Sequence, residues 1–468
     1  MSQIPQEQSP FALHPTIFVI FGITGDLASR KLLPSLLSLY SKKLLPPRFT
    51  VVGFSRRNFS KEEFREYIRG RLNISPGQFK EEDIKHFLDH IVYEQGFFDD
   101  VNSYNSLSER LSEIDMKNGQ CSNKLIHLAV PANLYEGILL NIAHSKLNVP
   151  CADEIGWTRI LIEKPFGEDI QNAQRLDKLL GKLFKEEQIF RIDHYLAKET
   201  LQNIIAFRFS NTIFEPLWNN KHIDKIHIKL FEKNGVEGRG ASYDSMGALK
   251  DVGQNHLLQM LALIAMNKPK TFDAKEIRKE RSRLLSKLIP INEKVISKHV
   301  VRGQYMGYRA ISGVKNESDT ETYFRIEAYI DNPKWTKVPF YIESGKAMHE
   351  TKTSIDIYFR NEDDEMEQNI LTFRIQPDEG IKIRFFVKTP GYEFKVEPKT
   401  LRFSYTDISN FLSTTNDYER LIHDAFVGDQ TLFASTQEIM SSWKFVTPIL
   451  ENMRHIPLIR YDKGSKEV

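Results

Sequence analysis

The sequence predicts an α/β domain of the Rossmann type, followed by an α+β domain with a large, mainly antiparallel sheet. The first part of the chain alternates short apolar strands with helical segments, which is typical of a parallel sheet covered on both faces. After about residue 195, the strands follow one another and alternate polar with apolar residues. Because 468 residues exceed one ordinary core, we expect two domains, 1–195 and 196–468.

The first domain begins after a polar lead-in, residues 1–14, which we expect to be disordered. Uninterrupted apolar runs predict buried strands, and longer mixed segments predict helices. The predicted strands are 16–21, 49–53, 124–130, 159–162 and 188–190, and the predicted helices are 26–45 and 61–71. Pro46 and Pro47 are expected to end the first helix.

The second domain shows the period-two alternation of a sheet with one solvated face. The predicted strands are 225–231, 322–331, 335–342, 356–360, 369–375 and 381–387. Helical stretches near 245–266 and 434–453 are expected to pack on the other face. The exposed edge or face of such a sheet is a candidate self-association surface.

The composition is that of an ordinary globular protein, with 41% hydrophobic and 27% charged residues. A net charge of +2 gives no reason to expect a nucleic-acid or membrane partner. The longest apolar run, 17–23, is too short to span a bilayer, and the N-terminus lacks the pattern of a signal peptide. Cys121 and Cys151 are interpreted as reduced thiols, which predicts a cytoplasmic protein.

The first predicted strand leads into a glycine-containing turn, GITGDLA, at residues 22–28. Such a turn between a first strand and a first helix presents backbone N–H groups to a pyrophosphate. The candidate cofactor-binding residues are Gly22, Thr24, Gly25, Asp26 and Leu27. Thr24 replaces the second glycine of the strict motif, so an ordinary tight turn is the alternative.

The second predicted strand ends in Arg56 and Arg57, without the carboxylate that usually binds the ribose of NAD. Guanidinium groups at this place favour the 2′-phosphate of NADP, and NAD remains a secondary cofactor. A pair of solvated surface arginines is the alternative. Lys164 follows the strand 159–162, at the strand end where ligands bind in parallel sheets.

Two further segments concentrate polar side chains. RIDHYLAKE, residues 191–199, places Asp193, His194, Tyr195 and Lys198 directly after an apolar strand, as a pocket for a polyhydroxylated anion would require. DVGQNHLLQML, residues 251–261, has a polar start that includes His256, whose imidazole suits a general base. The alternatives are a chance surface cluster and a helix start that faces solvent.

These motifs resemble those of the glucose-6-phosphate dehydrogenase family. RIDHYLAKE is similar to the family's RIDHYLGKE, GITGDLA to GASGDLA, and DVGQNHLLQML to DVMQNHLLQML, and the matches extend from Gly22 to Gln376. The resemblance implies oxidation of D-glucose 6-phosphate at C1 to 6-phospho-D-glucono-1,5-lactone. Hydride would pass to NADP, in the first step of the oxidative pentose phosphate pathway.

The resemblance also implies roles for individual residues. His256 matches the general base, and Asp193 matches the carboxylate that orients it. Arg56 matches the arginine at the adenosine phosphate, and Lys164 a lysine that touches both nicotinamide and sugar. Tyr135 matches a cofactor-contacting tyrosine, although the sequence alone equally allows a packing residue at a helix start.

The substrate site follows from the same comparison. His194, Tyr195 and Lys198 match the 6-phosphate site, Glu232 and Asp251 match carboxylates that accept sugar hydroxyls, and Lys346 and Gln376 match other sugar-contacting positions. Thr351 stands where the family usually has a basic residue, and the sequence leaves open whether Lys352 replaces it. No metal site is predicted, and the resemblance implies a homodimer or homotetramer.

Two other functions stay open at this stage. The first is an NAD(P)-dependent dehydrogenase of another sugar or sugar phosphate, against which Lys198 and His194 argue because they suit a phosphate. The second is a non-catalytic NADPH-binding regulator, which would be expected to lack the base or its orienting carboxylate.

Overall fold

The computed structural model describes residues 14–151, 156–361, 367–407 and 416–468. Apart from its last residue, the predicted lead-in 1–14 lies outside the described residues. The chain divides into two compact units. The first comprises residues 1–167, 171–197 and 415–436, and the second 168–170, 198–414 and 437–468. The boundary near residue 197 lies close to the expected one, but the segment 415–436 belongs to the first unit.

The first unit is built on a seven-stranded sheet with the order β15-β6-β5-β4-β1-β2-β3. Its strands are β1 Thr16–Phe21, β2 Phe49–Ser55, β3 Ile91–Gln95, β4 Asn123–Leu128, β5 Thr158–Ile162, β6 Ile189–Ile192 and β15 Phe433–Ala434. All neighbours are parallel except β15 on β6. Every residue of β1 is buried, as its unbroken apolar sequence requires. The strand order reverses between β1 and β4, which is where ligands bind in such sheets.

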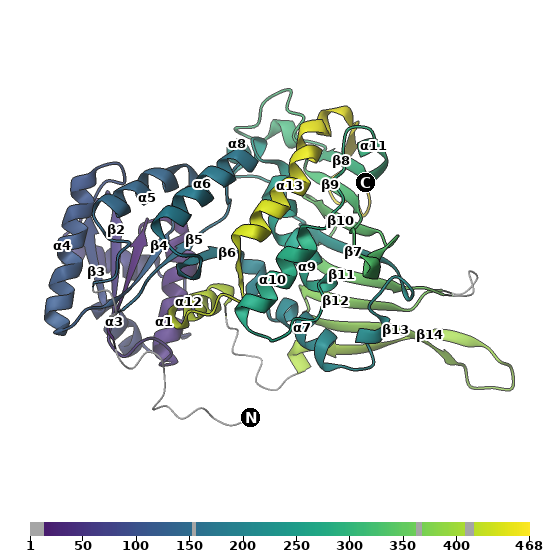
Figure 1. Ribbon diagram of the computed structural model, residues 1–468, viewed down its shortest axis with the longest axis horizontal. Helices are drawn as coiled ribbons and strands as arrows, with labels where there is room; N and C mark the ends of the chain where they lie inside the picture. The colour runs from purple at the N-terminus through teal and green to yellow at the C-terminus, as the bar shows by residue number, and fades with distance from the viewer. Residues whose placement is uncertain (1–13, 152–155, 362–366, 408–415) are drawn as a thin grey trace. The chain divides into compact units, whose positions relative to one another are not determined.

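Helices cover both faces of this sheet (Figure 1). They are α1 Leu33–Ser41, α2 Lys61–Arg71, α3 Glu81–Asp89, α4 Val101–Asn118, α5 Tyr135–His144, α6 Ile170–Leu183 and α12 Asp417–Val427. Helix α2 matches its prediction residue for residue, because Ser60 and Glu63 form a capping box at its start. The predicted helix 26–45 is shorter and interrupted. A π-helical turn, Ala28–Leu32, precedes α1, and the chain leaves the helix after Ser41, before the two prolines.

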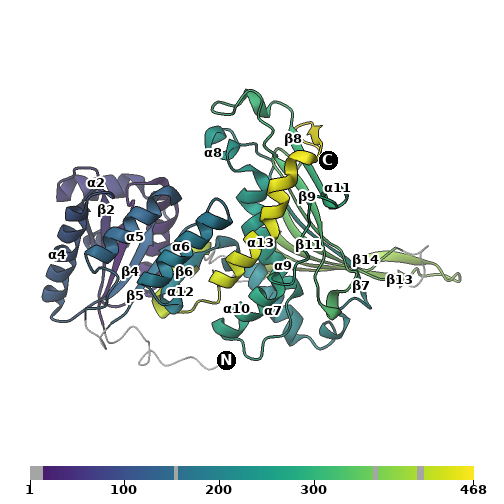
Figure 2. The same cartoon turned by 45° about the horizontal axis from the view of Figure 1, so that its top comes forward.

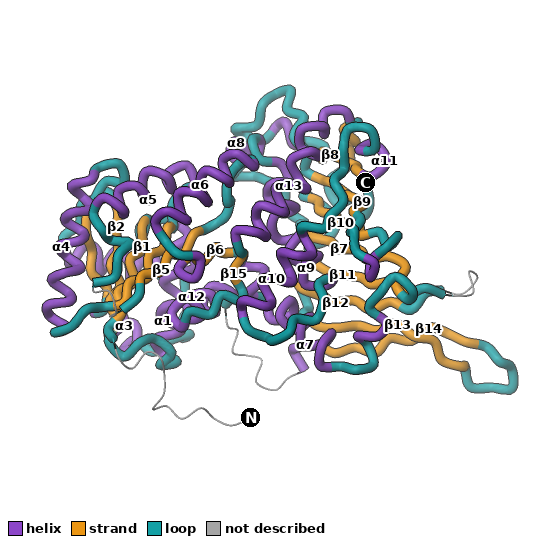
Figure 3. The backbone as a smooth tube through the Cα atoms, viewed as in Figure 1, coloured by secondary structure: helices purple, strands orange, loops and turns teal. Residues whose placement is uncertain are grey.

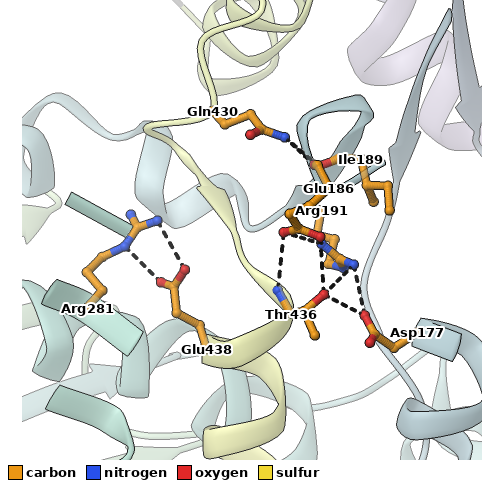
Figure 4. A network of polar contacts seen from close by, with 8 residues as sticks. All are labelled: Asp177, Glu186, Ile189, Arg191, Arg281, Gln430, Thr436 and Glu438. Atoms are coloured by element: carbon orange, nitrogen blue, oxygen red, sulfur yellow. Dashed lines mark hydrogen bonds and ion pairs between the residues drawn. The ribbon is translucent and has the colours of Figure 1, made fainter. Parts of the chain in front are cut away.

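Residues of the segment 416–436 form hydrogen bonds with β6, the strand that leads into the RIDHYLAKE motif, and with the turn before it (Figure 4). Arg191 on β6 donates to Glu186 at 3.0 Å, to Asp177 at 2.9 Å and to the hydroxyl of Thr436 at 2.8 Å. The Gln430 amide donates to the carbonyls of Glu186 and Ile189 at 2.8 and 2.9 Å. These bonds satisfy a guanidinium that is almost fully buried.

The second unit contains a nine-stranded sheet with the order β14-β13-β12-β11-β7-β10-β9-β8-β16 (Figure 3). Its strands are β7 Ile223–Phe231, β8 Val300–Tyr305, β9 Tyr323–Ala328, β10 Phe340–Gly345, β11 Lys352–Phe359, β12 Ile370–Gln376, β13 Gly380–Lys388, β14 Val396–Ser404 and β16 Leu458–Tyr461. Only β10 on β7 and β16 on β8 pair in parallel. The predicted fold class, a Rossmann-like domain plus a domain with a mainly antiparallel sheet, is confirmed.

Helices of the second unit gather on one face of its sheet (Figure 2). These are α7 Glu199–Ser210, α9 Leu258–Ala265, α10 Ala274–Leu285 and α13 Thr436–Asn452. The unit also contains the short helices α8 Gly240–Asp244 and α11 Ile296–His299. The predicted strand 335–342 was placed too early, since β10 begins at Phe340. Trp335 lies instead in a 3₁₀ turn, where its indole N–H donates to the carbonyl of Ala265 at 2.8 Å.

The two cysteines correct one prediction. Cys121 and Cys151 form a disulfide, with Cα atoms 5.8 Å apart, so the interpretation as reduced thiols is wrong. Cys121 precedes β4 and Cys151 follows α5, and the strand–helix return brings these two distant positions together. Spacing along the sequence could not reveal this proximity. Among the described helices, none has both the length and the apolar composition needed to cross a bilayer.

Candidate functional site

The glycine turn after β1 is held tightly in the first unit. The N–H of Gly22 donates to the Phe54 carbonyl at 2.9 Å, and the N–H of Gly25 donates to the Gly22 carbonyl at 2.9 Å. Gly22 has φ +83°, and a Cβ there would lie 2.5 Å from the carbonyl oxygen of Ala129. Only glycine fits this position, which allows the turn to lie against the end of β4.

A pocket of about 580 Å³ opens at this turn. It is lined by Gly22, Thr24, Gly25, Ser55, Arg56, Phe97, Phe98, Asp99, Ala129, Val130, Pro131, Asn133, Leu134 and Gly137. The lining comes from the ends of β1, β2, β3 and β4, at the point where the strand order reverses. A pocket of this size beside a glycine turn, at the carboxyl ends of parallel strands, suits the binding of a dinucleotide. Four predicted cofactor residues line it, whereas Asp26, Leu27, Tyr135 and Lys164 do not.

The two arginines after β2 differ in their surroundings. Arg57 donates to the Tyr67 hydroxyl at 3.3 Å and lies over its ring, while Tyr67 donates to the Thr24 carbonyl at 3.0 Å. Arg56 lines the pocket, and its guanidinium forms no hydrogen bond or ion pair with the described residues. Asp99 adds a carboxylate to the same pocket, which the sequence analysis did not anticipate.

Replacing Gly22 with alanine is expected to weaken NADP binding at least about tenfold, because the added Cβ would push the turn away from Ala129. Gly77→Ala is the matched control, since Gly77 has φ +78° but no atom within 4 Å of its added Cβ. Titration calorimetry with NADP gives both dissociation constants. Equal affinities in the two variants would contradict the close packing of the turn against Ala129.

The strand end before Lys164 is fixed by a buried polar network. The Glu163 carboxylate lies 3.0 Å from His127 Nε2 and accepts from the Tyr418 hydroxyl at 3.1 Å. The Tyr135 hydroxyl donates to the Glu163 backbone carbonyl at 3.0 Å. Burial, and then the neighbouring Glu163, raise the pKa of both tyrosines, so they remain neutral donors. Tyr135 therefore supports the strand end, and its contact with a cofactor stays a prediction.

The RIDHYLAKE motif leaves β6 as predicted. Asp193 Oδ1 accepts from the Tyr195 N–H at 3.1 Å, which shapes the 3₁₀ turn His194–Ala197. The His194 ring lies 5.1 Å from the Tyr195 ring and 6.5 Å from the Tyr418 ring, nearly parallel to the latter. Lys198 is the N-cap residue of α7, without a side-chain capping bond, and it begins the longest segment of the second unit.

The second unit holds a cluster of four charged groups. Lys346 Nζ lies 2.9 Å from Asp251 Oδ2 and forms a further ion pair with Glu232. Arg239 Nη2 contacts the same Asp251 oxygen at 3.2 Å. Burial, the largest single influence, acts to lower the Arg239 pKa. The charge and hydrogen bond of Asp251, together with the charges of Glu232 and Tyr243, outweigh burial and raise the Arg239 pKa. Three of these residues were predicted as sugar ligands, and the structure brings those three together.

His256 lies in the helix that starts beside this cluster. The helix opens with a π-helical stretch, Leu249–Leu257, a form that is frequent at functional sites, and continues as α9. His256 is buried, and its backbone N–H donates to Asn255 Oδ1 at 2.7 Å. The Asn255 amide donates in turn to the Asp251 carbonyl at 3.2 Å. The polar helix start is thus buried, so the alternative of a solvent-facing start is excluded.

The remaining predicted residues, Gln376, Thr351 and Lys352, lie on or next to β11 and β12. Gln376 ends β12 opposite Thr353. The Thr351 hydroxyl accepts from the Lys233 N–H at 3.1 Å, so it acts as a turn residue. Lys352 lies on β11 opposite Phe231, with its ammonium 3.7 Å from Glu350.

Sequence reasoning missed several residues that shape the site. Tyr418 and His127 act through Glu163, and Arg239 acts through Asp251. Arg239 lies in the motif EGRG, residues 237–240, where an arginine between glycines offered a weak signal. Tyr418 offered none, because it is more than 200 residues away in sequence from the groups that it contacts.

Comparison with protein families covers almost the whole chain. A model described as "Glucose-6-phosphate dehydrogenase, NAD binding domain" matches residues 19–203. A model described as "Glucose-6-phosphate dehydrogenase, C-terminal domain" matches residues 205–468. The two matches meet close to the boundary between the structural units.

Individual relatives agree with this result. The chain is 38% identical over 480 residues to a glucose-6-phosphate 1-dehydrogenase of Chlamydia pneumoniae, with 96% of this chain and 93% of the relative covered. It is 40% identical over 447 residues to one of Aggregatibacter actinomycetemcomitans, with 92% and 90% covered. A solved glucose-6-phosphate dehydrogenase in complex with its substrate, glucose-6-phosphate, aligns with a TM-score of 0.91 and 32% identity, covering 97% of this chain and 96% of that one.

Proposed function

Because the chain belongs to the glucose-6-phosphate dehydrogenase family, we propose that it oxidises D-glucose 6-phosphate at C1 to 6-phospho-D-glucono-1,5-lactone, with NADP as hydride acceptor. The observation that carries the proposal is the match to both family domains along the chain. The ion-paired cluster of Asp251, Lys346 and Glu232 supports it, because charged groups of both signs offer donors and acceptors to sugar hydroxyls.

The chemistry requires a base for the C1 hydroxyl proton and a positioned hydride acceptor. We assign the base to His256, oriented by Asp193, which would also stabilise the imidazolium that forms. Bound nicotinamide supplies the site that accepts the hydride. Lys164, on a strand end fixed by Glu163, is proposed to touch the sugar and the nicotinamide, and Gln376 to touch the sugar.

The phosphate of the substrate is assigned to His194, Tyr195 and Lys198. The His194 ring packs near the rings of Tyr195 and Tyr418, which give it an aromatic setting. An ammonium at the start of α7 adds a charge that suits a phosphate. A substrate without the phosphate would lose these contacts, which argues against an unphosphorylated sugar as the main substrate.

NADP rather than NAD is proposed as the preferred cofactor because of Arg56. Arg56→Ala is expected to raise KM for NADP about tenfold or more and to leave KM for NAD within about twofold. Arg57→Ala is the matched control, since the Arg57 side chain is engaged by Tyr67. Steady-state kinetics with both cofactors provide the test. An unchanged NADP preference in Arg56→Ala would contradict the assignment.

The function itself is tested by NADPH absorbance with a panel of sugars and sugar phosphates. We expect glucose 6-phosphate to give the highest kcat/KM and glucose a far lower one. A higher value with another sugar would favour the alternative, a dehydrogenase of that sugar. Absence of NADP reduction with every sugar would favour a non-catalytic NADPH-binding regulator.

We further propose that the protein works as a homodimer or homotetramer and is located in the cytoplasm. The long helices α7, α9, α10 and α13 lie on one face of the nine-stranded sheet (Figure 2), and its opposite face is a candidate surface for self-association. Light scattering coupled to gel filtration tests the oligomeric state. The disulfide between Cys121 and Cys151 weakens the original argument for the cytoplasm, so localisation of the tagged protein in cells is the appropriate test.

A further inference from the structure

A buried carboxyl group supports the start of the helix that carries Asp251 and His256. Glu321 Oε1 accepts from the Leu249 N–H at 3.0 Å, and the Glu321 backbone carbonyl accepts from the Ala248 N–H at 3.0 Å. The first N–H groups of a helix have no partner within it, and these two bonds supply partners for two of them. The side chain of Glu321 is almost fully buried, which makes an unsatisfied N–H at this place costly.

The residue after Glu321 supports the other half of the charged cluster. The Thr322 carbonyl accepts from the Lys346 N–H at 2.9 Å, and the Thr322 hydroxyl lies 2.8 Å from the Tyr461 hydroxyl. Thus Glu321 holds the helix that presents Asp251, and Thr322 holds the turn that presents Lys346. The 2.9 Å ion pair between Asp251 and Lys346 depends on both supports.

Gly247 shows how closely the Glu321 carboxyl is enclosed. It has φ +73°, and a Cβ on it would lie 2.4 Å from Glu321 Oε1 and 2.6 Å from Oε2. The backbone therefore passes directly over the carboxyl group. Any side chain at residue 247 would displace the carboxyl from the Leu249 N–H.

We propose that Glu321 is a positioning residue for sugar oxidation, which fixes the helix start so that Asp251 and His256 meet the substrate in the correct geometry. Glu321 touches neither substrate nor cofactor and acts through the Leu249 N–H. The inference rests on the proposed function, because it assumes that Asp251, Lys346 and His256 bind and oxidise the sugar.

Two variants separate the hydrogen bond from the charge. Glu321→Gln keeps an acceptor oxygen of the same reach, so kcat and both KM values are expected to stay within about twofold of the wild type. Glu321→Leu removes the acceptor and leaves the Leu249 N–H unsatisfied. We expect KM for glucose 6-phosphate to rise at least about tenfold, while KM for NADP stays unchanged.

This split distinguishes positioning from general destabilisation. Glu438 is the matched control, since it is a buried glutamate of the same unit, paired with Arg281 at 2.8 Å (Figure 4). Glu438→Gln is expected to lower Tm and leave both KM values unchanged. A folded Glu321→Leu enzyme with a normal KM for glucose 6-phosphate, or with both KM values raised together, would overturn the proposal.

Gly247→Ala displaces the Glu321 carboxyl by an added Cβ and leaves Glu321 itself in place. This variant also tests the contact if Glu321→Leu does not fold. It is expected to raise KM for glucose 6-phosphate as Glu321→Leu does. Gly307→Ala is its control, because Gly307 has φ +90° and its added Cβ meets only Lys463 Cε, at 3.9 Å. Equal KM values in the two alanine variants would contradict the role of the enclosed carboxyl.

The environment of Glu321 also predicts a pH dependence of stability. Burial raises the pKa of Glu321 to about 7, although the Leu249 N–H and the charges of Arg302 and Lys250 act in the other direction. The neutral phenol of Tyr243 faces the same group. The folded chain thus keeps a proton that the unfolded chain releases at lower pH. The resulting stability is fully present below the unfolded pKa and is lost as pH rises through about 7.

Glu321→Gln has no such proton to lose. As pH rises from 5 to 8, the Tm of the wild type is therefore expected to fall relative to the Tm of Glu321→Gln. A constant difference would contradict the enclosed carboxyl on which the inference depends.

Hydrogen exchange separates failure of this inference from failure of the proposed function. The Leu249 amide is expected to exchange at least tenfold faster in Glu321→Leu than in Glu321→Gln, whatever the substrate. If the wild type does not oxidise glucose 6-phosphate, the proposed function fails even when this difference is found. If the wild type is active and the two variants exchange and react alike, the positioning role of Glu321 fails alone.

Discussion

Replacing His256 with asparagine is expected to lower kcat about 10²–10⁴-fold, because the proposed function assigns to His256 the removal of the C1 hydroxyl proton. Asparagine keeps a polar group at this buried position, although its side chain is smaller, so Tm is measured to confirm that the fold is retained. KM for glucose 6-phosphate and for NADP should change only modestly, since the loss concerns the transition state. Steady-state kinetics provide the measurement.

The control for this prediction is His455→Asn, which removes a half-exposed imidazole that lies 3.7 Å from Glu293. It is expected to leave kcat unchanged. A nearly normal kcat in His256→Asn would contradict the assignment of the base. A loss of kcat together with a loss of Tm would instead point to a structural role for the imidazole.

Replacing Lys198 with glutamine is expected to raise KM for glucose 6-phosphate about 10–10²-fold. The proposed function assigns Lys198 to the phosphate, and a charge-assisted bond of this kind contributes roughly 1.5–3 kcal/mol. Glucose provides the control within the same protein, since it lacks the phosphate. Its kcat/KM should change little. A comparable loss with both sugars would contradict the assignment of Lys198 to the phosphate.

The sequence predicted best what depends on local patterns. The buried strand Thr16–Phe21 and the helix Lys61–Arg71 were placed correctly, because an apolar run and a capping box carry their own signals. Elements that depend on tertiary contacts were displaced or missed. The return of residues 416–436 to the first unit relies on a two-residue strand and on single bonds such as Gln430 to Ile189.

In the candidate site, too, the residues that carry a local motif were predicted, and those that act through tertiary contacts were not. Asp251, Lys346 and Glu232 were selected by resemblance, and the structure brings them into one ion cluster. Their supports lie far away in sequence and were not predicted. Glu321 and Tyr418 act on other residues through single hydrogen bonds, and such contacts leave no periodic pattern in the sequence. The disulfide was missed for the same reason, since its two ends meet only after folding.

The central claim, that this chain transfers hydride from C1 of glucose 6-phosphate to a nicotinamide, is tested most directly by isotope transfer. The purified protein would be incubated with NADP and glucose 6-phosphate that carries deuterium at C1, and the NADPH analysed by mass spectrometry. We expect one deuterium atom in each NADPH formed. NADPH without deuterium, or no NADPH at all, would contradict the account.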